Sequence, residues 1–201
     1  VLYNVCRIFR NKHLIYELTR ENYKKFKRSF FKKAYLSSMI LALSILVGFI
    51  ITIIYCKGFS TNSIIAEGSL GGQIKYSMSP IFYIFTVLYR VFVAGIIYTN
   101  FSLIVARKNH NFYIANILSY LLFIGTEAVL EGLGDYIFYE FFHIDSMIIF
   151  INMINVFNLN LGKGIVALYL PLTIILIVTS IIVYLKYRNK EKLIIDCEKN
   201  G

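Results

Sequence analysis

Three charged residues lie inside segments that are otherwise apolar: Arg90 in one segment, and Glu127 and Glu131 in the next. A charge inside an apolar span is costly to bury, so each needs a partner or a function. Glu127 and Glu131 are four residues apart and share one helix face. Because only a short link separates the two segments, we expect them to be neighbours, with Arg90 and Glu127 close enough for an ion pair. Such a pair either locks two helices together or lines a polar path or gate, and the pattern fits both.

The remaining residues that could do chemistry form no catalytic pattern. The histidines are His13, His110 and His143, and the topology derived below puts the first two on the opposite side of the membrane from the third. The sequence has no HExxH, GxSxG, CxxC or GxxxxGK[ST] motif, and its three cysteines are far apart. We therefore predict no catalytic residue, no metal site and no cofactor.

The elements that must carry the three charged residues are membrane spans. Of the 201 residues, 58% are hydrophobic and 16% are charged, whereas an average soluble domain has roughly 25% charged residues. A bilayer can cover apolar surface that a chain of this length cannot hide in its own core. The segments long enough to cross are about 34–56, 80–106, 112–132 and 164–185. We predict an all-α polytopic membrane helix bundle with four spans, divided into a basic cytoplasmic segment 1–33 and a transmembrane domain 34–201.

The charges are distributed unevenly along the chain. The formal net charge is +10, and the basic residues gather in 1–33, at 107–108 and in 186–192, whereas 133–163 is net acidic. The positive-inside rule places these basic stretches in the cytoplasm, which four spans satisfy with both the N-terminus and the C-terminus inside. We therefore expect a multi-pass protein of a cell membrane. Because the basic clusters abut the spans, we expect them to contact the lipid bilayer, and we expect no nucleic acid as a partner.

Two segments outside the spans have helical patterns of their own. Tyr23, Phe26 and Phe30 recur on one helix face among basic residues, which predicts an amphipathic helix lying on the inner leaflet. The alternative is that this face packs on a partner protein. On the extracellular side, the apolar stretch 147–157 is too short to cross a membrane and predicts a re-entrant or interfacial segment.

Neutral polar residues also lie inside the predicted spans. Asn100 belongs to the span 80–106, and Asn116 and Ser119 belong to the span 112–132. Amide and hydroxyl groups within a bilayer seek partners on neighbouring helices. We expect all three side chains to make hydrogen bonds between helices.

Three stretches resemble a known family. They are RENYKKFKRSFFKKAYLSS at 20–38, IIYTNFSLIVARKNHNFYIANILSYLLF at 96–123, and INVFNLNLGKGIVALYLPL at 154–172. A basic aromatic lead-in enters a span, a small basic turn joins two spans, and an extracellular segment leads into the last one. In this order and style the chain resembles the permease subunits of ABC-2-type exporters of low-GC Gram-positive bacteria, including those that serve bacteriocin or peptide export and immunity. Such permeases usually have six spans, so a chain with four would be a reduced relative or would lack an N-terminal part.

The resemblance implies a function without catalysis in this chain. A separate ATP-binding cassette ATPase subunit would hydrolyse ATP, and a second permease subunit, identical or different, would complete a dimer that moves a peptide or a lipophilic molecule. The surface that receives the motion of the ATPase would comprise Lys24, Lys25, Lys27, Arg28, Arg107 and Lys108. The alternative for these cations is that they only anchor the topology. The alternative function is a non-transporting membrane accessory or bacteriocin-immunity protein.

Overall fold

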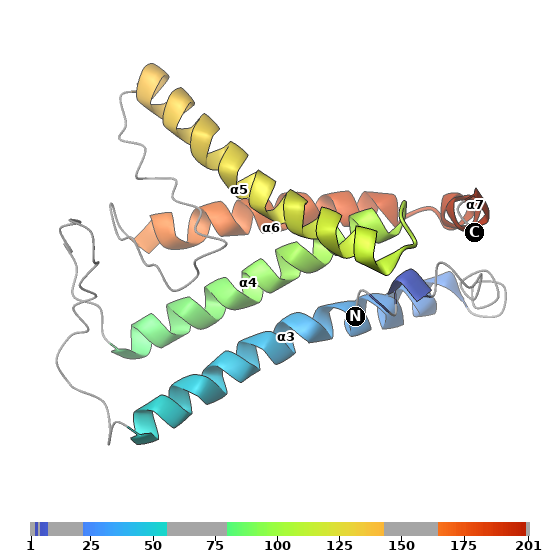
Figure 1. Ribbon diagram of the computed structural model, residues 1–201. Helices are drawn as coiled ribbons and strands as arrows, with labels where there is room; N and C mark the ends of the chain where they lie inside the picture. Colours follow the sequence, from blue (N-terminus) through green and yellow to red (C-terminus); the bar gives the residue numbers. More distant parts are fainter. Residues whose placement is uncertain (1–2, 4, 8–21, 56–79, 143–164, 200–201) are drawn as a thin grey trace. The chain divides into compact units, whose positions relative to one another are not determined.

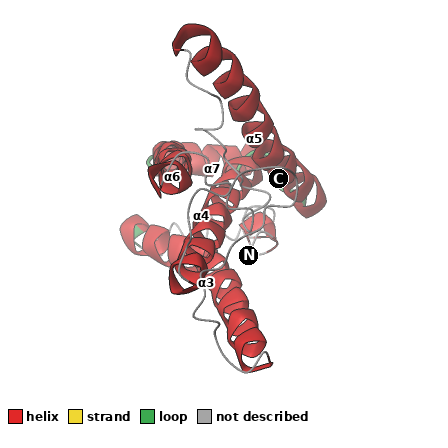
Figure 2. Cartoon of the chain, turned by 90° about the vertical axis from the view of Figure 1, so that its left-hand side faces the viewer, coloured by secondary structure: helices red, strands yellow, loops and turns green. Residues whose placement is uncertain are grey.

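The computed structural model describes residues 3, 5–7, 22–55, 80–142 and 165–199, and the rest of the chain is not described. The described helices are, in chain order, α3 (Tyr23–Tyr55), α4 (Pro80–Ala106), α5 (Phe112–Phe142), α6 (Ile165–Lys186) and α7 (Lys190–Lys199) (Figure 1). Figure 2 shows only helices and short connections in this part of the chain, with no strand. The prediction of an all-α fold is therefore confirmed.

Asparagines define where several of these helices begin. Asn22, Asn111 and Asn189 stand directly before or at the start of α3, α5 and α7. In each case the side-chain carbonyl oxygen accepts a hydrogen bond from the backbone N–H two residues later, at 3.1, 3.0 and 3.0 Å respectively. An asparagine in this position satisfies one of the N–H groups that the first turn of a helix leaves unpaired. α4 instead begins at Pro80, whose missing N–H costs nothing in a first turn.

Among the residues that the structure describes, three helices are long and apolar enough to cross a membrane: α3, α4 over Ile84–Ala106, and α5 over Phe112–Val129. The number rises to four if Leu172–Lys186 of α6 and Lys190–Asp196 of α7, which meet at an angle of 82°, count as one broken span. The length and composition of these helices support a membrane-spanning protein.

The predicted and observed helix ends agree for two spans and differ for the other two. The predicted span 80–106 coincides with α4, and 164–185 lies within one residue of α6 at each end. α3 begins at Tyr23 rather than near residue 34, and α5 continues to Phe142, well beyond residue 132. The reason is that counting apolar residues locates the part that fits a bilayer, whereas backbone hydrogen bonding carries a helix on through polar sequence. The predicted extracellular segment 147–157 lies outside the described residues.

The chain divides into two compact units, which are described separately. Unit 1 comprises Val1–Met39, Gly95–Gly125 and Ile175–Gly201, and unit 2 comprises Ile40–Ala94 and Thr126–Ile174. In unit 2, the hydroxyl groups of Thr86 and Tyr169 are 2.8 Å apart, and the rings of Tyr89 and Tyr169 pack edge to face with centroids 4.9 Å apart.

The core of unit 1 joins both ends of the described chain to α4. It contains Val5, Cys6, Phe26, Phe30, Ala34, Leu103, Val105, Ala106, Ala115, Val183, Tyr187 and Leu193. Phe26 and Phe30 are therefore buried inside the protein, and the prediction that their face lies on the inner leaflet is wrong for these two side chains. The helical spacing was read correctly, but the aromatic face meets Tyr187 and its neighbours instead of lipid.

Much of the remaining apolar surface has no protein cover. In the most apolar stretch of each helix, 61% of the α4 residues are buried, but only 6% of those in α3 and 17% of those in α5. Large exposed side chains include Ile51 and Ile54 on α3, Leu121 on α5 and Ile177 on α6. Exposed apolar side chains in this number call for an apolar surrounding, which a bilayer supplies.

Candidate functional site

A pocket of about 910 Å³ lies within unit 1, where α4 and α6 end and α7 begins. We call it the basic pocket, because six of its lining residues are cationic. The residues that line it are Tyr23, Arg107, Lys108, Leu185, Lys186, Arg188, Asn189, Lys190, Lys192 and Asp196. Asp196 is the one acidic residue among them.

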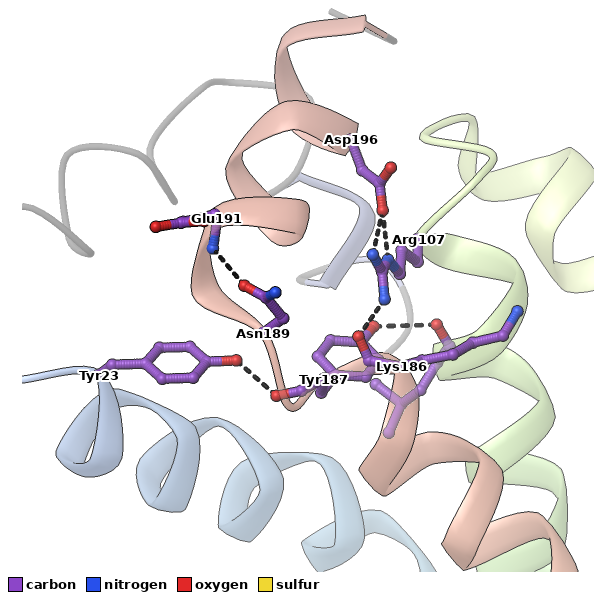
Figure 3. A network of polar contacts seen from close by, with 8 residues as sticks. Tyr23, Arg107, Lys186, Tyr187, Asn189, Glu191 and Asp196 are labelled. Atoms are coloured by element: carbon purple, nitrogen blue, oxygen red, sulfur yellow. Dashed lines mark hydrogen bonds and ion pairs between the residues drawn. The ribbon is translucent and has the colours of Figure 1, made fainter.

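The guanidinium group of Arg107 holds one wall of the basic pocket together (Figure 3). Its Nε and Nη2 atoms both contact Oδ2 of Asp196 on α7, and its Nη1 atom donates a hydrogen bond to the carbonyl oxygen of Lys186. The side chain of Arg107 is 11% exposed and that of Asp196 is 36% exposed. A cation beside the last carbonyl groups of α6 is favourable, because those groups lack partners within the helix and carry the negative end of its dipole. Arg107 thus fixes the bend between α6 and α7.

Tyr187, directly after α6, connects two further helices to this wall (Figure 3). Its hydroxyl donates a hydrogen bond to the carbonyl oxygen of Leu103 on α4 at 2.9 Å, and its own carbonyl oxygen accepts one from the hydroxyl of Tyr23 on α3. Its ring packs against Phe30 and Phe31 of α3, with centroid distances of 5.8 and 5.6 Å. Tyr187 is 3% exposed, so this junction is built into the core.

The six predicted coupling residues all belong to unit 1, but they are not equally available. The side chains of Lys24, Lys25 and Arg28 on α3 are exposed, as is that of Lys108 after α4. Lys27 is half-buried, with its ammonium group 4.4 Å from the centre of the Tyr184 ring, which is a cation–π contact. Arg107 is occupied by Asp196 and the end of α6, as described above. The role of these residues in coupling stays a prediction.

The charged residues within the predicted spans belong to unit 2. Arg90 is 2% exposed and Glu127 is 8% exposed, and the two side chains attract each other electrostatically. This attraction gives a physical reason for burying both charges, since an isolated charge would be far more costly. Glu131 lies one turn further along α5, and its side chain is outside the described part of the structure.

The predicted polar contacts between helices are confirmed for both asparagines. The Asn100 side chain accepts a hydrogen bond from the Tyr35 hydroxyl on α3 at 2.7 Å and donates to the hydroxyls of Thr179 and Ser180 on α6, at 3.1 and 3.2 Å. Asn116 on α5 accepts one from a tyrosine hydroxyl of α4 at 2.8 Å. The prediction for the hydroxyl of Ser119 was wrong, because it donates to a carbonyl oxygen of its own helix. A serine hydroxyl can donate its hydrogen bond to a carbonyl oxygen of its own helix, whereas the longer amide side chain of asparagine reaches a neighbouring helix.

Sequence reasoning missed α7, and with it the basic pocket. The local signals were Asn189 as a helix-capping residue and Leu193 and Ile194 among charged residues, which give a ten-residue helix one apolar side. Leu193 is fully buried in the core of unit 1. The pairing of Arg107 with Asp196 has no local signal, because 89 residues separate the two.

Cys6 is the free cysteine recorded in the described part of the structure, and it is buried in the core of unit 1. This burial raises the pKa of the Cys6 thiol, since a thiolate is poorly solvated there. Within the described ranges, no group of three or more histidine, cysteine, aspartate or glutamate side chains is placed to hold a metal ion.

Comparisons of the chain with known protein families, with curated proteins and with solved structures give no match. The function is therefore inferred from the helices, the basic pocket and the charges described above.

Proposed function

We propose that this chain is the membrane-spanning permease subunit of an ABC-type exporter of a bacterial cell membrane, with its ATP hydrolysis carried out by a separate ATPase subunit. The observation that supports this most is the composition of unit 1. The start of α3, the turn between α4 and α5, and the junction of α6 with α7 pack into one unit that presents exposed cations. A compact surface of this kind is what an attached motor needs in order to move several spanning helices together.

The proposed topology has four spans, with both ends in the cytoplasm. It counts α6 as the fourth span and treats α7 as a cytoplasmic helix beyond the bend of 82°. The basic segment before α3 and the cations that follow α4 and α6 then all lie on the cytoplasmic side, in agreement with the positive-inside rule. The stretch 147–157 would be the re-entrant or interfacial segment on the outer side.

In this mechanism the permease contributes binding and movement, not bond chemistry. The ATPase would contact unit 1 differently in its ATP-bound and ATP-free states, and that difference in contact free energy would shift the permease between inward-facing and outward-facing arrangements. A second permease subunit would supply the other half of the pathway for a peptide or a lipophilic molecule. The exposed residues Lys24, Lys25, Arg28 and Lys108 are the proposed points of contact with the ATPase.

The test is to isolate tagged protein from its native host in mild detergent and to identify by mass spectrometry what is bound. We expect a stoichiometric ATPase, whose recovery falls when Lys24, Lys25 and Arg28 are replaced with glutamine. Lys27 is left unchanged, because its contact with Tyr184 gives it a structural role.

The matched control removes the same number of exposed cations elsewhere in unit 1, in the variant Arg7→Gln, Lys32→Gln, Lys33→Gln. ATPase recovery should be unchanged in this control. Recovery of no ATPase under any detergent condition would refute the permease proposal and favour the non-transporting accessory or immunity protein. Equal loss of ATPase in both variants would show that the contact depends on net charge and not on this face of α3.

A further inference from the structure

Among the residues that the structure describes, six cations and one carboxylate line the basic pocket. Its acidic residue, Asp196, is already paired with Arg107. Three charges act most strongly on the ammonium group of Lys186. Lys108 and Arg107 repel it, and Asp196 attracts it. Arg188, Lys190 and Lys192 add three more cations to the lining. A bound anion would relieve this repulsion.

The local backbone also favours an anion. Asn189 and Lys190, at the beginning of α7, line the pocket, and the N-terminal end of a helix carries the positive end of its dipole. The volume of about 910 Å³ exceeds that of a single small ion and lies in the usual range for sites that hold larger molecules.

An exposed apolar strip leads directly into this pocket. Leu185, which lines the pocket, is 58% exposed, and Ile181 and Ile177 precede it at intervals of four residues on the same helix face with exposures of 52% and 57%. The cationic pocket therefore adjoins a surface suited to hydrocarbon, at the point where the apolar part of α6 ends. A free phosphate would use the cations alone, whereas a phospholipid would use both surfaces.

We propose that the basic pocket binds a phosphate group, and that the group belongs to an anionic membrane lipid whose acyl chains lie along Ile177, Ile181 and Leu185. Basic pockets at the ends of spanning helices are suited to such headgroups. This site is independent of the proposed transport function and would be present whether or not an ATPase binds. It differs from general attraction to an anionic surface because it requires the particular cations of the pocket.

The sequence offers a clean probe, because the chain contains no tryptophan. The variant Leu185→Trp places a single indole at the edge of the pocket, in the full-length protein reconstituted into bilayers. Phosphatidylglycerol or phosphatidylcholine with brominated acyl chains is then mixed with unbrominated lipid, since bromine quenches an indole that it contacts. Ile117→Trp, on the 60% exposed position of α5 that does not line the pocket, is the reference probe.

With Leu185→Trp we expect brominated phosphatidylglycerol to quench at a much lower mole fraction than brominated phosphatidylcholine. At the reference position the two lipids should quench equally. Adding Lys186→Gln and Arg188→Gln should weaken the preference by about fivefold for each charge, on the order of 25-fold together. The pair Lys190→Gln and Lys192→Gln, on α7, gives a second test if the first variant does not fold.

The matched control is Lys32→Gln with Lys33→Gln, which removes the same charge from exposed positions of α3 outside the pocket. It should leave the preference intact. Equal quenching by both lipids at the pocket position, or equal loss of preference in the control and the pocket variants, would overturn the proposal. Displacement of the brominated lipid by millimolar glycerol phosphate or inorganic phosphate would show that the pocket takes a free phosphate, and would overturn the assignment to a lipid.

Discussion

Asn100 offers the sharpest test of how the helices of unit 1 are held together. Its side chain is fully buried, and its three hydrogen bonds join α4 to Tyr35 on α3 and to Thr179 and Ser180 on α6. Replacement by leucine keeps a branched side chain of similar size and removes all three hydrogen bonds. The variant Asn100→Leu therefore isolates the polar contribution from the packing contribution.

The expected loss follows from the number of bonds. Hydrogen bonds between membrane helices contribute about 0.6 kcal/mol each on average and at most about 1.7 kcal/mol. Three of them give about 2 kcal/mol. The Thr179 hydroxyl keeps its bond to the carbonyl oxygen of Ile175 at 2.8 Å, so its desolvation adds little to the cost. We expect the free energy of unfolding to fall by about 2 kcal/mol.

The measurement is reversible unfolding of the purified protein in mixed micelles with increasing mole fraction of dodecyl sulfate. The control is Asn116→Leu, which removes one interhelical hydrogen bond at an exposed position and should cost about 0.6 kcal/mol. Tyr35→Phe removes one of the three Asn100 bonds and should likewise cost about 0.6 kcal/mol. A loss for Asn100→Leu no larger than that for Asn116→Leu, or a gain in stability, would show that these hydrogen bonds do not hold the helices together.

Three further results are expected. Arg107→Gln should release α7 from the end of α6 and speed amide hydrogen exchange in α7 at least tenfold, whereas unchanged exchange would show that the ion pair with Asp196 does not hold the bend. Glu127→Gln should destabilise the fold by several kcal/mol, because the buried Arg90 guanidinium then loses its attraction to the Glu127 carboxylate. Changing both residues to leucine should recover most of the melting temperature, unless the charge pair is needed for another reason. In a variant whose other cysteines are serine, Cys6 should react with a maleimide far more slowly than in detergent-unfolded protein. Its rate should rise at a higher pH than that of an exposed cysteine, since burial raises its pKa; equal rates would contradict its burial.

The sequence was sufficient wherever a single local property decides the structure. The bounds of α4 follow from Pro80 at its start and from the basic turn after Ala106. Asn100 could be predicted to bond across helices because an amide inside a span has few other options. The bounds of α3 and α5 could not be obtained in the same way, since the helix continues where the sequence becomes polar. Hydropathy predicts which part of a helix fits a bilayer, and it does not predict where that helix ends.

The basic pocket could not be predicted because its cations look alike in the sequence. Arg107 and Lys108 are adjacent, yet Arg107 forms an ion pair with Asp196, whereas Lys108 is exposed and lines the pocket. Lys27 is likewise distinguished from Lys24 by its lower exposure and by its contact with the Tyr184 ring. Such differences depend on residues far away in the chain, which no local pattern encodes.

This division of the cations makes the two proposals separable by experiment. The exposed cations of α3 do not line the basic pocket, and Arg188, Lys190 and Lys192 are not on α3. Loss of Lys24, Lys25 and Arg28 should therefore reduce ATPase recovery and leave the lipid preference, whereas loss of Arg188, Lys190 and Lys192 should do the reverse. If both properties fell together in both variants, the positive charge of unit 1 would act as one diffuse field, and neither surface would be a specific site.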